Sequence, residues 1–187
     1  MAVQLPRLYT VEEFERFVDL PENEDFTFEF IGGEIVEVTS NPYSSQVSMR
    51  TGRLIGNFVD EHQLGYVTGE AGGYVVFGER YAPDVGFVSK ARQRRLAQRG
   101  YNPIPPDLAV EVFSPSDTEK KLRIKIANYI AAGTVVWVIY PMTQEVEIYV
   151  PGKPVEFVDK NGVINGGDVL PGFTLSVAKI FEGLYDE

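Results

Sequence analysis

The 187-residue sequence contains no cysteine and only one histidine, His62. Without cysteine there can be no disulfide, no thiolate zinc site and no cysteine nucleophile. One histidine excludes the two-histidine zinc site of HExxH proteases and leaves a Ser-His-Asp triad a single candidate base. No run of about 18 apolar residues is present, so we expect no transmembrane helix. The first residues lack a basic start followed by an apolar run, so we expect no signal peptide and a cytoplasmic location.

Basic residues are also few relative to acidic ones. The chain has 17 basic against 27 acidic residues, a net charge of −10, which is not typical of nucleic-acid-binding proteins. The bases are nevertheless concentrated, with nine of them between residues 90 and 125. This concentration is compatible with solvated surfaces or with phosphate contacts. The nine residues are Lys90, Arg92, Arg94, Arg95, Arg99, Lys120, Lys121, Arg123 and Lys125.

Capping boxes and apolar stripes predict three helices. Thr-Val-Glu-Glu at 10–13 predicts a helix over 11–18, in which the threonine accepts from a backbone N–H and the last glutamate reaches back. An apolar stripe predicts a second helix over 44–61. Ser-Asp-Thr-Glu at 116–119 predicts a third helix that ends just before Gly133, a residue type favoured after a helix C-terminus.

Alternating and continuous apolar runs predict the strands. Two alternating runs around Gly32-Gly33 indicate a hairpin. Residues 65–89 read as short strands with glycine turns, and a hairpin is expected over 145–158. The continuous apolar runs at 108–113 and 135–140 indicate buried strands. The pattern predicts a single α/β domain with a mixed sheet.

Glu111 is the most unusual residue of these strands, because it lies in the middle of the apolar run Leu-Ala-Val-Glu-Val-Phe. On a strand it would share a face with Ala109 and Phe113. Burial of an unpaired carboxylate costs several kcal/mol, so a buried Glu111 requires a metal or a lysine as its partner. The alternative is that this face of the strand is exposed to water.

Three further residues are candidates for the same site. Asp84 belongs to a Pro-Asp pair that leads directly into a strand, although Pro-Asp is also a common turn. Lys125 lies at the edge of a buried helical stripe and can reach inward, or it can simply cover apolar surface. Glu29 alternates with two phenylalanines on a strand that could be half-exposed.

Two carboxylates and a lysine around one sheet would form a site whose metal ligands are all oxygen atoms. We therefore expect Asp84, Glu111 and Lys125 to converge. Such a site suits Mg²⁺ or Mn²⁺, which would bind a phosphate oxygen and lower the pKa of a water. The lysine would orient that water or neutralise charge on the phosphate.

The motifs and their order resemble the Uma-two family of the PD-(D/E)xK nuclease superfamily. The similarity runs from about Tyr9 to Phe181. Its most specific part is Pro-Asp-Leu-Ala-Val-Glu-Val-Phe-Ser-Pro-Ser-Asp at 106–117, followed by Lys125, Tyr129, Gly133 and Trp137 at intervals of four. The resemblance implies a restriction-endonuclease-like fold: one domain over 1–187, with a mixed β-sheet flanked by helices and extra N- and C-terminal hairpins.

The resemblance also implies roles for the candidate residues. Asp84 and Glu111 would be the motif acids that bind Mg²⁺ or Mn²⁺, with the backbone carbonyl of Val112 as a further ligand. Phe113 stands where the lysine of the usual E-x-K motif is expected, so Lys125 would supply that lysine from the following helix. Glu29 matches a further family glutamate near the start of the core.

The leading hypothesis is thus a metal-dependent endonuclease that hydrolyses DNA, and the superfamily's tendency to dimerise implies a homodimer. Two alternatives remain open. The first is a nuclease fold with an inert site that acts by binding protein or nucleic acid. The second is a glycosidase that uses the Asp84/Glu111 pair. Glycosidases usually have aromatic sugar platforms, however, and the only tryptophan, Trp137, lies in a run expected to be buried.

Overall fold

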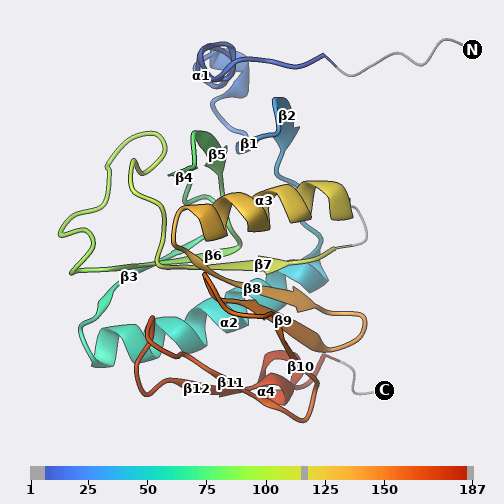
Figure 1. The fold of residues 1–187 in the computed structure, drawn as a ribbon. Coiled ribbons are helices and arrows are strands. Elements are labelled where there is room, and N and C mark those ends of the chain that lie inside the picture. The colour runs from blue at the N-terminus through green and yellow to red at the C-terminus, as the bar shows by residue number, and fades with distance from the viewer. Residues whose placement is uncertain (1–6, 115–117, 185–187) are drawn as a thin grey trace, which may run out of the picture.

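A computed structural model describes residues 7–114 and 118–184. Its centre is a six-stranded mixed sheet in the order β10-β9-β8-β7-β6-β3 (Figure 1). Neighbours β7 and β8 are parallel and are joined by the crossover helix α3 (Glu119–Ala131), whereas the other neighbouring pairs are antiparallel. The strands are β3 (Gly65–Gly69), β6 (Val85–Ser89), β7 (Leu108–Val112), β8 (Val135–Tyr140), β9 (Glu145–Tyr149) and β10 (Glu156–Val158).

Layers cover both faces of this sheet. Helix α2 (Pro42–Glu61) packs on one face with the short helix α4 (Val177–Phe181), next to the two-stranded sheet of β11 (Val163–Asn165) and β12 (Thr174–Ser176). Helix α3 packs on the opposite face. In β7, Val110 and Val112 point into the α2 layer and Ala109 points toward α3. Because side chains alternate along a strand, Glu111 also lies on the α3 face.

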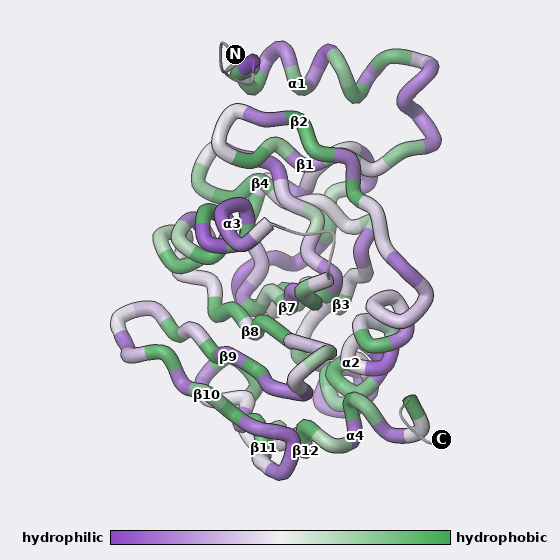
Figure 2. Tube along the Cα trace, turned by 90° about the vertical axis from the view of Figure 1, so that its right-hand side faces the viewer, coloured by the Kyte–Doolittle hydropathy of each residue, from purple (hydrophilic) through white to green (hydrophobic). Residues whose placement is uncertain are grey.

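A second, four-stranded sheet lies beside α3 in the order β2-β1-β5-β4. Helix α1 (Val11–Val18) closes its outer side, where the buried ring of Phe14 packs 5.5 Å from that of Phe30. Figure 2 shows the resulting order of layers, with α1 at one end of the molecule and α4 at the other. The strands are β1 (Phe28–Ile31), β2 (Glu34–Glu37), β4 (Tyr74–Val76) and β5 (Glu79–Tyr81), and the chain between α1 and β1 contains the 3₁₀ turn η1 (Pro21–Asn23).

The local signals for α1 and for the first hairpin are confirmed. Thr10 and Glu13 form both hydrogen bonds of the capping box. Gly32 and Gly33 have φ values of +58° and +83°, the left-handed conformation that favours glycine. Gly133 follows α3 with φ +79°, as the sequence predicts.

Two helix starts differ from the expectation. Helix α2 begins at Pro42 instead of residue 44, because the Asn41 side chain accepts a hydrogen bond from the Ser44 amide. Helix α3 is capped by Thr118, whose hydroxyl accepts from the Lys121 amide. The expected cap, Ser116, lies outside the described residues. No helix in the described part of the chain is long and apolar enough to cross a membrane.

Candidate active site

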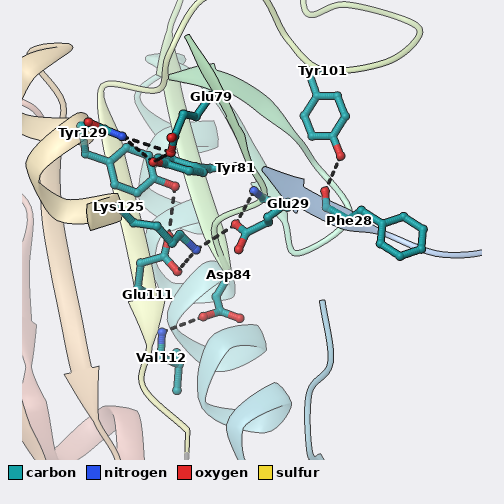
Figure 3. Close-up of polar contacts among 12 residues, drawn as sticks. Phe28, Glu29, Glu79, Tyr81, Asp84, Tyr101, Glu111, Val112, Lys125 and Tyr129 are labelled. Carbon is teal, nitrogen blue, oxygen red and sulfur yellow. Dashed lines mark hydrogen bonds and ion pairs between the residues drawn. The ribbon is translucent and has the colours of Figure 1, made fainter. Parts of the chain in front are cut away.

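A cavity of about 240 Å³ opens between the two sheets and α3. Its inner wall combines residues that are far apart in the sequence, and Figure 3 shows their side chains pointing toward one another. The chain reaches this arrangement because β1 of the small sheet contacts α3, while Glu111 near the end of β7 lies on the α3 face of the large sheet. The sequence-predicted residues that line the cavity are Glu29, Asp84, Glu111, Val112 and Lys125.

Lys125 lies between two carboxylates. Its Nζ is 2.6 Å from Glu111 Oε2 and 2.8 Å from Glu29 Oε1. All three residues are only 6–7% exposed, so each charge depends on its partners rather than on water. The Glu29 Oε1 atom also accepts a hydrogen bond from the Ala82 amide at 2.8 Å, which fixes this carboxylate to the chain just before Asp84.

Asp84 lies at the start of β6, beside the end of β7. Its Oδ2 accepts a hydrogen bond of 2.6 Å from the Val112 amide. The N–H and C=O of one strand residue point to the same side of the strand. The Val112 carbonyl therefore points to the side on which Asp84 lies, which suits its expected use as a further oxygen ligand.

The sequence did not reveal the polar residues behind this cluster. Tyr129 is fully buried and its hydroxyl donates to Glu111 Oε1 at 3.0 Å. The Tyr81 ring lies 5.7 Å from Lys125 Nζ, and its hydroxyl accepts from Asn128 and donates to Glu79. The sequence includes Tyr129 in the motif that carries the family resemblance, but this motif assigned it no role in the site. Its spacing of four from Lys125, which brings both side chains to one face, is the signal that could have identified it.

Burial and like charges shift the titration of the acids. Burial raises the pKa of Asp84 to about 6, although the Val112 amide and Lys125 oppose the shift. Burial also raises the pKa of Glu111, and Glu29 and Asp84 add to this rise while Lys125 lowers it. Burial alone would lower the pKa of Lys125, but Glu111 and Glu29 outweigh it and hold the pKa well above the usual value. Lys125 is therefore a cation at neutral pH.

The charge balance of the cavity fits a divalent cation. Four carboxylates and two ammonium groups line the cavity, so the fully ionised lining carries an excess of two negative charges. They belong to Glu29, Glu37, Asp84, Glu111, Lys121 and Lys125. The donor atoms are oxygens, which suit Mg²⁺ or Mn²⁺. Among the described residues no three acidic or histidine side chains form a ready metal cage. Two carboxylates with a carbonyl fit Mg²⁺, which usually keeps several waters.

The mouth of the cavity is polar and partly basic. Lys121, from the first turn of α3, lines it and forms an ion pair of 3.2 Å with Glu34. The other basic segment, residues 90–99, follows the far end of β6 and lies at the opposite end of the β6–β7 pair (Figure 1). There Arg92 is 3.1 Å from Asp107. The hydroxyl residues that line the cavity are Thr39, Ser40, Ser44, Ser114 and Thr118.

Comparison with known proteins identifies the family of the chain and supports its fold. The Uma2 family model, described as "Putative restriction endonuclease", matches residues 11–178, and the chain belongs to this family. The fold is similar to a crystal structure described as "a putative nuclease belonging to DUF820" from Anabaena variabilis ATCC 29413. The two share 22% identity over 94% of this chain and 98% of that chain, with a TM-score of 0.77. This likeness confirms the predicted restriction-endonuclease-like fold. No curated protein sequence matches the chain.

Proposed function

We propose that the chain is an endonuclease that hydrolyses phosphodiester bonds of DNA and depends on Mg²⁺ or Mn²⁺. The observation that carries the proposal is the buried Lys125, which pairs with Glu111 and Glu29 beside Asp84 in a cavity of a chain that belongs to a nuclease family. Asp84, Glu111 and the Val112 carbonyl would hold the ion. When bound, the ion would supply Lewis-acid polarisation of the phosphate and would lower the pKa of a water.

The protein's own residues divide the remaining work. Lys125 would act as a hydrogen-bond donor that orients the attacking water and offsets charge on the phosphate. Glu29 holds the lysine in place through its 2.8 Å contact. Lys121 at the mouth would contact a neighbouring phosphate of the strand.

Cleavage assays on single- and double-stranded DNA and on RNA, with Mg²⁺, Mn²⁺ or EDTA, test the proposal. We expect metal-dependent cleavage of DNA, and we expect Glu111→Gln to lower the rate about 100-fold or more. The matched control is Glu145→Gln, an exposed residue on β9 away from the cavity, which should keep the wild-type rate. Absence of cleavage with every metal by a folded protein would contradict the proposal and favour the inert binding module.

We also propose that the protein acts as a homodimer in the cytoplasm. Each chain has one such cavity among its described residues, so cutting both strands of a duplex calls for two chains. If the protein is a homodimer, we expect double-strand breaks in plasmid DNA and a mass of twice the monomer in analytical ultracentrifugation. A monomer that only nicks plasmid DNA would contradict it.

The structure does not support the glycosidase alternative, because Trp137 is buried beside Phe173 and cannot serve as an exposed sugar platform.

A further inference from the structure

Both oxygens of the Glu111 carboxylate have a fixed hydrogen-bond donor. Lys125 binds Oε2 at 2.6 Å, and the Tyr129 hydroxyl binds Oε1 at 3.0 Å. Both donors come from α3, one turn apart on the same face of the helix. A carboxylate has about four lone-pair sites, so two sites stay available after these two bonds.

The two donors fix the direction in which those sites point. One bond would leave the carboxylate free to turn about its last torsion, which is broad for glutamate. Two bonds to different oxygens remove that freedom. The ring of Tyr129 is itself held, because it is fully buried and packs edge-on to Tyr81 at 5.3 Å.

Tyr81 is fixed in turn by a carboxylate that joins three elements. Glu79 on β5 accepts hydrogen bonds from the Tyr81 hydroxyl, from Asn128 of α3 at 3.2 Å and from the Gly32 amide of the β1–β2 turn at 2.7 Å. The contacts that hold Tyr81, and through it the ring of Tyr129, therefore extend to β1, the strand that carries Glu29. This packing gives the Tyr129 hydroxyl a defined place rather than a mobile one.

We infer that Tyr129 is a positioning residue that orients the Glu111 carboxylate for the divalent ion. The inference rests on the proposed function, since it concerns the same cavity. Partners that orient a ligand through its second atom typically change metal affinity or activity by about 10- to 100-fold when they are removed. Tyr129 acts through Glu111 and has no other part in the proposed chemistry.

The test is a titration of the metal-free protein with Mn²⁺, in which electron paramagnetic resonance measures the concentration of the free ion. Tyr129→Phe removes only the hydroxyl, and we expect the Mn²⁺ dissociation constant to rise about 10-fold. Tyr74→Phe is the matched control: Tyr74 is equally buried in the same core layer, but its hydroxyl pairs with Thr68. Its Mn²⁺ affinity should equal that of the wild type, whatever its melting temperature.

Two further variants separate a lost hydrogen bond from lost packing. At position 129, 4-methylphenylalanine fills the space of the hydroxyl without donating, and 4-aminophenylalanine restores a donor. We expect weak Mn²⁺ binding with the first and near wild-type binding with the second. Equal Mn²⁺ affinity in the wild type and in the folded variants without a donor would overturn the inference. If the wild type binds no Mn²⁺, or if Glu111→Gln binds it unchanged, the proposed function itself fails.

Discussion

At the scale of single residues, the site is a cluster in which each charge depends on another. Lys125 is buried between Glu111 and Glu29, and removal of either acid would leave the lysine with one partner. Asp84 differs from these acids because its main partner is a backbone amide. Because its partner is the Val112 amide and not Lys125, Asp84 is the acid whose titration can be separated by mutation.

Asp84 should make the metal-free protein less stable as the pH rises from about 4 to 6. Burial raises its pKa to about 6, so the folded state holds the proton at pH values where the unfolded chain has released it. Stability then falls as the pH rises through this window. Asp84→Asn removes this loss, so relative to the wild type it should gain stability between pH 4 and pH 7, by at most about 3 kcal/mol.

Urea unfolding of both proteins at pH 4 and at pH 7, with a chelator present, measures this gain. The exposed residue Asp168 offers the matched control, and Asp168→Asn should show no such gain. A constant stability difference between Asp84→Asn and the wild type at both pH values would show that Asp84 titrates normally.

At the scale of elements, local signals were sufficient for several helix ends and turns that depend on neighbouring residues, although the Asn41 cap of α2 was missed. The Thr10 capping box, the Gly32-Gly33 turn and the Gly133 terminus are of this kind. The alternation around Glu111 also gave the correct face of β7, because side-chain direction on a strand depends only on sequence position.

Contacts between segments that are distant in the sequence could not be predicted from such local signals. Nothing near Glu29 indicates that it meets Lys125, which is 96 positions later, because that contact depends on how the small sheet sits beside α3. The pairing of β5 with β1 and the role of Glu79 depend on the same packing. The site could therefore be predicted as a set of residues, mainly through the family resemblance, but its outer hydrogen bonds could not.

The end of α3 gives a test of backbone conformation. A Cβ at Gly133 would meet no atom within 4 Å, so any cost of Gly133→Ala comes from its φ of +79°. We expect this change to lower the free energy of unfolding by about 1–2 kcal/mol. Gly56 on α2 also has open space, but its backbone is helical, so Gly56→Ala should raise stability by about 0.5–1 kcal/mol. Chemical denaturation measures the free energy of unfolding of both variants. Changes of the same sign in the two variants would contradict this account.

At the scale of the whole molecule, the structure separates two basic groups that charge alone did not distinguish. Lys121 of α3 lines the cavity, whereas Arg123 of the same helix forms an ion pair with Glu147 on β9. Residues 90–99 lie at the other end of the β6–β7 pair, where Arg92 joins Asp107 and the Ala132 carbonyl. We therefore expect the phosphate contact nearest to the cavity to come from Lys121.

Salt-dependent DNA binding distinguishes these groups. If Lys121 contacts a phosphate, Lys121→Ala should flatten the log-log salt dependence of affinity by roughly one unit for every DNA sequence alike. Arg95 is exposed on the distant segment, and Arg95→Ala should leave both affinity and slope unchanged. The opposite result, a flatter slope for Arg95→Ala alone, would place the DNA on the other end of the sheet.

The central claim is that the cavity beside Lys125 holds the divalent ion used in phosphodiester cleavage. The most direct measurement is a crystal structure of the protein with Mn²⁺, in which anomalous scattering locates the ion. The account predicts a peak within about 2.0–2.6 Å of oxygen atoms of Asp84 and Glu111, and no peak at this place in Glu111→Gln. A wild-type crystal whose Mn²⁺ lies elsewhere, while the soaked protein cleaves DNA, would contradict the assignment of the site.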